Sequence, residues 1–213
     1  MGRSDEGKRA SAQEEGGARE RLLVAAAQLW ADRGYHSISV REICETAEVT
    51  KPTLYYHFGS KVGLAKALLD DAAGNLLAAV ERIVGETAPL REKLNGIARL
   101  IFERSSAAPR TCRFFYAAMF TPTRTGVDQY FDETITPIFA LTAAVFEDGR
   151  RAGEMVGGDP ELAAMLLLGA VQAYVMRFVR KSDVDLTPAL AERTVARLLA
   201  GLAPRPAAED TAE

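Results

Sequence analysis

One short segment of the chain concentrates side chains suited to contact with nucleic acid. The segment from Val49 to Lys66 contains three lysines, two tyrosines and a histidine, and no acidic residue. Cationic and hydroxyl groups bind phosphate oxygens, and polar side chains near the start of a helix reach base edges in the major groove. The whole chain carries a formal net charge of −3, so any DNA affinity must come from such a local surface.

The other reactive residue types are sparse. The chain has two cysteines, Cys44 and Cys112, and two histidines, His36 and His57, too few for a disulfide framework or a metal cluster. It has no glycine-rich phosphate loop and no nucleophile beside a plausible base. We therefore expect neither an enzyme nor a bound cofactor or metal. Cys44 is expected to be a buried packing residue, with redox sensing as the alternative.

The residues around the cationic segment predict two short helices with a turn between them. Ser39 and Glu42 have the spacing of a capping box, which starts one helix. Thr50 is a plausible N-cap for the next helix, with Pro52 in its first turn and its end near Gly59. This arrangement has the size of a helix-turn-helix, in which the second helix enters the major groove.

Helical patterns also surround this pair. Residues 1–17 lack apolar periodicity and are expected to be a disordered arm, a solvated tail or a DNA-contacting one. A helix is predicted from Ala18 to Gly34, and one long helix from Ser60 through Ile83. Further helices are predicted near 88–106, 109–120, 126–149, 159–180 and 187–202, several of them with proline in the first turn.

The predicted fold is all-α, with about nine helices. Pro137 should kink the helix that contains it. The longest apolar run, Met165 to Tyr174, is interrupted by Gly169 and is too short to cross a membrane. The N-terminus lacks a secretory signal, and we expect a cytoplasmic protein with no membrane partner. Residues 203–213 are expected to be a loose tail.

An ordered set of residues from Leu22 to Leu64 resembles the DNA-binding domain of the TetR family of transcriptional regulators. The set consists of Trp30, Gly34-Tyr35, Ser39, Ile43-Cys44, Ala47-Glu48-Val49-Thr50, Tyr55-Tyr56-His57-Phe58, Lys61 and Leu64. The resemblance implies a DNA-binding domain over residues 18–78, with the motif at about 38–57. It also implies an effector-binding and dimerisation domain over 79–203, followed by a tail at 204–213.

The resemblance also implies roles for individual residues. Lys51, Pro52, Thr53 and Tyr55 match positions that face base edges or adjacent phosphates, and Arg41 matches a further base contact. Thr50, Tyr56, His57 and Lys61 match positions that hold the DNA backbone. Two alternatives remain open: Arg41 as a plain solvated residue, and Tyr55 as a core residue. Leu54 and Phe58 are expected in the core.

Two positions depart from the family pattern. Glu48 stands where glycine is usual in the turn, which costs about 1 kcal/mol if the turn requires positive φ. Val62-Gly63 replaces a helix-favouring acidic residue, which weakens the start of the next helix by about 1 kcal/mol. Gly63 and Gly74 are also candidate points of flexibility in that helix.

The C-terminal helices carry long apolar faces, and the hydrophobic pattern does not show what these faces pack against. In the family such helices form a dimer interface, and an intramolecular core is the alternative. A homodimer is expected, because one recognition helix reads only a few base pairs and an inverted repeat needs two. The expected interface residues are Leu167, Val171, Tyr174, Phe178, Leu198 and Leu202.

Aromatic and methionine side chains in the middle of the chain could line a pocket or only a core. The candidates for an apolar or aromatic effector are Phe102, Phe115, Met119, Phe139, Met165 and Tyr174. The expected function is a transcriptional regulator, a repressor that a small effector releases from a palindromic operator. An activator, or a helical small-molecule binder that no longer binds DNA, is the alternative.

Overall fold

The computed structural model describes residues 3–73, 76–119, 133, 135–155 and 158–202, and side chains for slightly fewer of them. Every regular element in these ranges is an α-helix, as predicted, and ten helices are present there rather than about nine. They divide between two compact units, residues 1–74 with 107–132 and residues 75–106 with 133–213.

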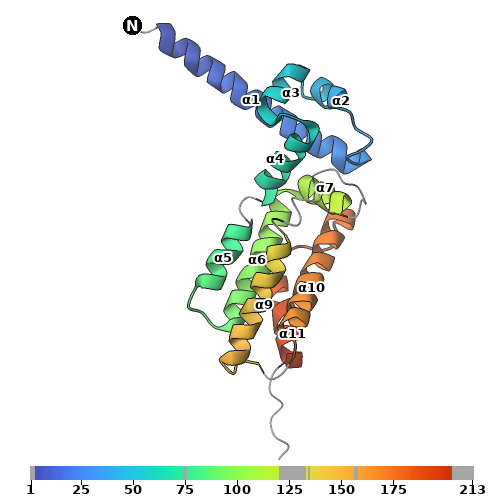
Figure 1. The fold of residues 1–213 in the computed structure, drawn as a ribbon. Coiled ribbons are helices and arrows are strands. Elements are labelled where there is room, and N and C mark those ends of the chain that lie inside the picture. Colours follow the sequence, from blue (N-terminus) through green and yellow to red (C-terminus); the bar gives the residue numbers. More distant parts are fainter. Residues whose placement is uncertain (1–2, 74–75, 120–132, 134, 156–157, 203–213) are drawn as a thin grey trace, which may run out of the picture. The chain divides into compact units, whose positions relative to one another are not determined.

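The first unit is built on α1 (Arg3–Arg33), which contacts four other helices. These are α2 (Val40–Thr46), α3 (Lys51–Phe58), α4 (Lys61–Ala73) and α7 (Pro109–Met119) (Figure 1). Leu22, Ala26 and Trp30 of α1 are fully buried in their shared core. Trp30 lies 4.9 Å from Phe114 of α7, measured between ring centroids.

The sequence predicts a disordered arm over residues 1–17, whereas α1 begins at Arg3 in the structure. A segment without apolar periodicity has no face to pack, but its backbone still forms a helix where the residues are good helix formers. The stretch contains three glutamates, two alanines and two arginines, beside four glycines, which are poor helix formers. The predicted end of α1 is confirmed, since Gly34 has φ 80 directly after Arg33.

The predicted long helix after Ser60 is also wrong. It is replaced by α4 and by α5 (Leu76–Gly85), which belong to different units. Gly74 and Asn75 lie between them in the sequence and outside the described residues; glycine and asparagine are both poor helix formers. The suggestion that Gly74 is a flexible point lies outside the described residues as well.

The second unit contains α5, α6 (Leu90–Ala107), α9 (Thr136–Arg151), α10 (Pro160–Lys181) and α11 (Pro188–Leu202). These helices lie side by side as a bundle, with α10 in contact with both α9 and α11 (Figure 1). The predicted kink at Pro137 is wrong: this proline is in the first turn of α9, where its missing N–H has no helical partner to lose. The cap at Asp159 is confirmed, because its side chain accepts from the Glu161 N–H.

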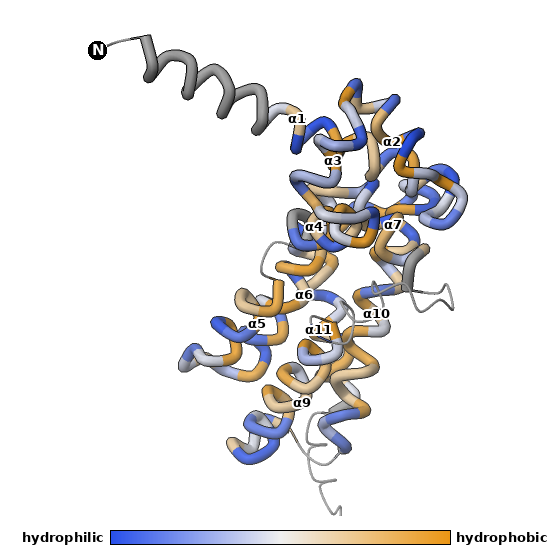
Figure 2. Tube along the Cα trace, turned by 45° about the horizontal axis from the view of Figure 1, so that its top comes forward, coloured by the Kyte–Doolittle hydropathy of each residue, from blue (hydrophilic) through white to orange (hydrophobic). Residues whose placement is uncertain are grey.

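The longest apolar helix of the second unit is α10. By length and composition it would be able to cross a membrane, contrary to our expectation from the sequence, although core helices of soluble proteins meet the same criterion. Figure 2 shows hydrophobic colouring over most of its length. Seven of its residues are buried within the unit, at Ala163, Ala164, Leu167, Leu168, Val171, Val175 and Val179. Packing inside the bundle therefore accounts for one face of α10.

Candidate nucleic-acid interface

The start and end of α3 follow the local signals of the sequence. Thr50 is the N-cap, and its side chain accepts a hydrogen bond from the Thr53 N–H at 3.4 Å. Gly59 ends the helix with φ 69, and its N–H donates to the Tyr55 carbonyl. Both ends of α3 thus have partners for backbone groups that the helix itself leaves unpaired.

The two apolar residues of α3 fix which face points outward. Leu54 is 0% exposed and Phe58 packs against the same core, as predicted. Arg19 of α1 lies over the Phe58 ring, 5.7 Å from its centroid. These contacts orient the remaining side chains of the helix toward solvent.

The outward face of α3 carries the predicted contact residues. Lys51 and Pro52 are exposed, and Tyr55 and Tyr56 are 49% and 74% exposed. Tyr55 is therefore not a core residue, which settles the alternative left open by the sequence. Thr53 and His57 are half-buried beside them. Cationic, hydroxyl and aromatic groups on one short exposed helix suit contact with a DNA groove.

Arg41 lies at the start of α2, whose cap is the predicted box. The Ser39 side chain accepts from the Glu42 N–H, and Glu42 accepts from the Ser39 N–H at 2.8 Å. Arg41 is exposed and pairs with Glu45 at 2.7 Å, and this hydrogen bond raises the pKa of Arg41. An exposed pair of this kind is weak, so the guanidinium can exchange Glu45 for a phosphate or base.

The turn between α2 and α3 holds glutamate in a left-handed conformation. Glu48 has φ 53, which confirms that this turn requires positive φ, and the Val49 N–H donates to the Cys44 carbonyl at 3.0 Å. Cys44 is buried, as expected, and its burial raises the pKa of the thiol. A structural role for Cys44 is therefore favoured over redox sensing.

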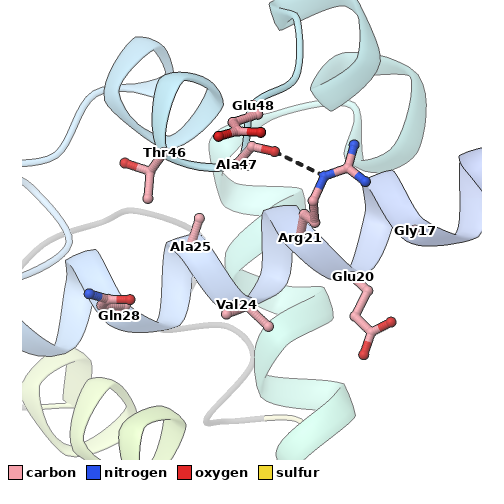
Figure 3. A pocket seen from close by; sticks show the side chains of 9 residues that line it. All are labelled: Gly17, Glu20, Arg21, Val24, Ala25, Gln28, Thr46, Ala47 and Glu48. Atoms are coloured by element: carbon pink, nitrogen blue, oxygen red, sulfur yellow. Dashed lines mark hydrogen bonds between the residues drawn. The ribbon is translucent and has the colours of Figure 1, made fainter.

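Arg21 supports this turn from α1 and was missed in the sequence, where nothing distinguishes it from a solvated helix residue. Its Nε donates to the Ala47 carbonyl at 3.1 Å, on the wall of an open pocket of about 480 Å³ (Figure 3). Glu20, Val24 and Glu48 also line this pocket.

Lys61, predicted to hold the DNA backbone, has an internal partner. Its Nζ donates to the Tyr35 carbonyl at 2.6 Å and lies 4.3 Å from the centroid of the Tyr35 ring. Burial lowers the pKa of Lys61, and the charge of Glu42 opposes this change.

Gly63 lies where the backbones of α3 and α4 approach each other closely. A Cβ at Gly63 would lie 1.9 Å from the Phe58 carbonyl oxygen, so a side chain would force the backbone apart. The Gly63 N–H donates to the Ser60 side chain at 2.9 Å, the cap predicted for this helix. The close approach of α3 and α4 is thus a steric reason for glycine at this position.

The candidate effector residues are divided between the two units. Phe115 packs against the core of the first unit, whereas Phe102 and Tyr174 contact each other in the second, with ring centroids 6.2 Å apart. Phe139 is half-buried, and Met165 is 61% exposed. The side chain of Met119 lies outside the described residues.

The candidate interface residues include two that the structure contradicts. Leu167 and Val171 are 1% and 0% exposed in the single chain, so they belong to its core and cannot face a partner. Tyr174, Phe178 and Leu198 are half-buried, and the side chain of Leu202 is not described. The exposed apolar residues of α10 are instead Leu162, Met165 and Leu166, on another face of the same helix.

Comparisons with known proteins agree with this geometry. Residues 22–68 match the sequence model described as "Bacterial regulatory proteins, tetR family". The HTH-type transcriptional activator FasR of Mycolicibacterium smegmatis is 38% identical over 85 residues, 40% of this chain and 39% of that protein. The HTH-type transcriptional repressor KstR2 of Rhodococcus jostii is 26% identical over 88% of this chain and 92% of that protein.

Solved structures share the fold over most of the chain. The ketosteroid transcriptional regulator KstR2 of Mycobacterium tuberculosis has a TM-score of 0.74 at 22% identity, over 88% of this chain and 95% of that one. The transcriptional regulator FadR of Bacillus subtilis, solved with stearoyl-CoA, has a TM-score of 0.71 at 22% identity, over 86% and 98%.

Proposed function

The chain belongs to the TetR family of helix-turn-helix transcriptional regulators, and we propose that it is a repressor that a small apolar or aromatic effector releases from a palindromic operator. Members of this family are not enzymes. The observation that carries the proposal is the exposed face of α3, with Lys51, Tyr55 and Tyr56 accessible while Leu54 anchors the helix. That face would enter the major groove.

We assign DNA binding and effector binding to different parts of the chain. Residues 18–78 would bind operator DNA, and residues 79–203 would bind the effector and a second copy of the chain. We propose that the protein acts in the cytoplasm. In the groove, Lys51 and Arg41 would donate to guanine acceptors, and Pro52 or the Thr53 methyl group would contact a thymine methyl. Thr50, Tyr56 and His57 would hold phosphates.

The second copy would cover the exposed apolar face of α10. Leu162, Met165 and Leu166 are all more than half exposed in the single chain, although apolar residues of this size are usually covered. Gly169 lies on the same side of the helix, and a Cβ there would meet open space, so a partner helix can approach closely. Two recognition helices would then read half-sites about 34 Å apart.

The proposed effector class draws on the relatives. One structural relative was solved with stearoyl-CoA and another is a ketosteroid regulator; an acyl chain and a steroid are both largely apolar. In this chain Phe102 and Tyr174 supply an aromatic pair in the second unit. The effector would favour a dimer geometry that no longer matches the half-sites.

Repression is proposed over activation because the repressor KstR2 aligns with 88% of this chain, whereas the activator FasR aligns with 40%. A helical binder that has lost DNA binding is less well supported, since the outward face of α3 retains its lysine and tyrosines. Operator position relative to a promoter would separate a repressor from an activator.

The test is in-vitro selection of DNA by the purified chain. We expect enrichment of an inverted repeat, and a relaxed preference at one base position in each half-site for Lys51→Ala. Lys181→Ala, which removes an exposed lysine at the end of α10, serves as the control and should select the same sequence as the unchanged chain. Failure to enrich any inverted repeat would contradict the proposal.

A further inference from the structure

Lys61 differs from Lys51 in where its ammonium group lies. Lys51 is exposed on α3, whereas Lys61 is half-buried at the first position of α4. The Lys61 Nζ donates to the Tyr35 carbonyl at 2.6 Å and lies 4.3 Å from the Tyr35 ring centroid. One cation therefore holds both the backbone and the ring of a residue 26 positions earlier.

Tyr35 is itself fixed by the core of the first unit. Its ring centroid lies 5.1 Å from that of Trp30 and 6.2 Å from that of Phe114. Trp30 and Phe114 are both fully buried. The acceptor of the Lys61 hydrogen bond thus belongs to a packed aromatic cluster, defined here as Trp30, Tyr35 and Phe114, and not to a loose loop.

The donor of this bond lies directly after the proposed recognition helix. Only Gly59 and Ser60 separate Lys61 from the last residue of α3, and the Phe58 carbonyl is held against Gly63 by close backbone contact. A displacement of Lys61 would therefore move the C-terminal end of α3. Anchoring Lys61 to the aromatic cluster fixes the angle at which α3 is presented.

The electrostatic environment agrees with an internal partner. Desolvation by burial lowers the pKa of Lys61, and the Glu42 carboxylate is the charge that opposes this change. Glu42 is held at the capping box of α2 and also pairs with Arg33 at 3.0 Å. A partly desolvated ammonium with a backbone acceptor and a π-face below it is stabilised where it lies.

We propose that Lys61 is a positioning residue, which orients α3 through the Tyr35 carbonyl and ring and neutralises no DNA phosphate. This assignment rests on the proposed DNA-binding function. It replaces the phosphate contact that the family resemblance implies for this position. Of Lys51 and Lys61, Lys51 has the exposed side chain, so its charge would enter the groove between the phosphates while it donates to a base.

The salt dependence of DNA binding separates the two roles. Each phosphate that a side chain neutralises contributes about 0.9 to the slope of log K against log salt concentration. With the selected operator as probe, Lys61→Met should weaken binding roughly tenfold without changing this slope. Lys51→Ala, the matched control, removes an exposed cation that would lie in the groove beside phosphates, and should reduce the slope by up to about 0.9.

Two measurements without DNA test the tether itself. Trp30 is the only tryptophan of the chain, so its fluorescence reports on the aromatic cluster. Lys61→Met should lower the unfolding midpoint and increase quenching of Trp30 by acrylamide, and Lys51→Ala should change neither. Tyr35→Ala removes the ring and keeps the carbonyl. It should therefore have effects of the same kind, and adding Lys61→Met to it should cause the further loss of the hydrogen bond to the carbonyl.

The outcomes are distinguishable from failure of the proposed function. If the unchanged chain binds no DNA, the regulator proposal fails, while the unfolding and fluorescence measurements still test the tether. A slope reduced by about one in Lys61→Met, with unchanged unfolding, would overturn the positioning role. Tyr35→Phe, which keeps the carbonyl and a ring, should behave as the unchanged chain. Should Lys61→Met not fold, Lys61→Gln, which removes the charge and keeps a hydrogen-bond donor, gives the same comparison of salt slopes.

Discussion

Glu48 is a single residue at which backbone conformation and side-chain type disagree. Its φ of 53 lies in the left-handed region, where residues with a Cβ are strained. The turn nevertheless forms, because the Val49 N–H bonds the Cys44 carbonyl and Arg21 bonds the Ala47 carbonyl. Contacts on both sides thus hold a conformation that glutamate disfavours.

We expect Glu48→Gly to raise the free energy of unfolding by about 1 kcal/mol, because glycine adopts this conformation without strain. Chemical denaturation measures the change. Glu45→Gly, in the right-handed backbone of α2, is the control and should lower the same quantity by about 1 kcal/mol. Equal effects of the two variants would contradict the role of φ.

Glu42 links the stability of the first unit to pH. Hydrogen bonds from the Ser39 backbone and side chain, and then the Arg33 charge, lower its pKa below the ordinary value of 4.5. The depressed pKa means that the ionised carboxylate stabilises the fold above pH 4.5. This contribution is lost as the pH falls through the lower pKa of the folded state.

Glu42→Gln should therefore unfold with a smaller pH dependence below pH 4.5 than the unchanged chain, since glutamine accepts hydrogen bonds but does not titrate. Unfolding midpoints at successive pH values give the comparison. Glu103→Gln, at an exposed position on α6, is the control. If both variants flatten the profile equally, Glu42 is not the group responsible.

At the scale of elements, the contact between α3 and α4 depends on the absence of a side chain at Gly63. The Phe58 carbonyl oxygen occupies the place of a Cβ, at 1.9 Å. Helix propensity alone predicts that alanine would improve α4 at this position. The steric conflict with backbone atoms reverses that prediction.

We expect Gly63→Ala to lower the free energy of unfolding by about 1–3 kcal/mol, the usual cost of overpacking, and to weaken operator binding because α3 shifts. Gly85→Ala is the matched control. Gly85 ends α5 and a Cβ there meets no atom within 4 Å, so this change should be neutral or stabilising. Chemical denaturation of both variants measures the free energy of unfolding. A Gly63→Ala variant more stable than the unchanged chain would contradict the steric role of this position.

At the scale of the whole molecule, α10 is apolar on more than one face. One face is buried in the second unit through residues such as Leu167 and Val171. Another exposes Leu162, Met165 and Leu166. A helix that is apolar nearly all round is usually covered on all sides, which favours a second copy of the chain as the missing cover.

Gly169→Arg should convert the proposed dimer into a monomer, because a large charged side chain would occupy the space left for the partner helix. The single chain should tolerate the change, since a Cβ at Gly169 meets open space. Sedimentation measures the mass, and operator affinity should fall with loss of the second half-site. Ala140→Arg, at an exposed position on α9, is the control and should stay dimeric. If both variants are monomers, or if both are dimers, the proposed interface is contradicted.

Local signals in the sequence were sufficient to predict several helix ends and the position of the proposed recognition helix, α3. The Ser39 and Thr50 caps and the Gly34 and Gly59 ends depend on residues within a few positions of each other. The outward face of α3 follows from its own composition, because Leu54 and Phe58 are its two strongly apolar side chains. These helix ends and this outward face depend on residues close together in the chain, so the sequence by itself determined them.

Tertiary packing decided the rest. The apolar residues of α10 lie on two faces, and periodicity cannot tell which face meets α9 and α11; we assigned Leu167 and Val171 to the wrong one. The partners of Lys61 and Arg21 are backbone carbonyls 26 residues away. Lysine and arginine are equally common at exposed positions without such partners, so the residue types alone do not reveal these hydrogen bonds. The close approach at Gly63 likewise depends on where α3 ends in space. Contacts between distant segments set these roles, and no spacing within a single helix encodes them.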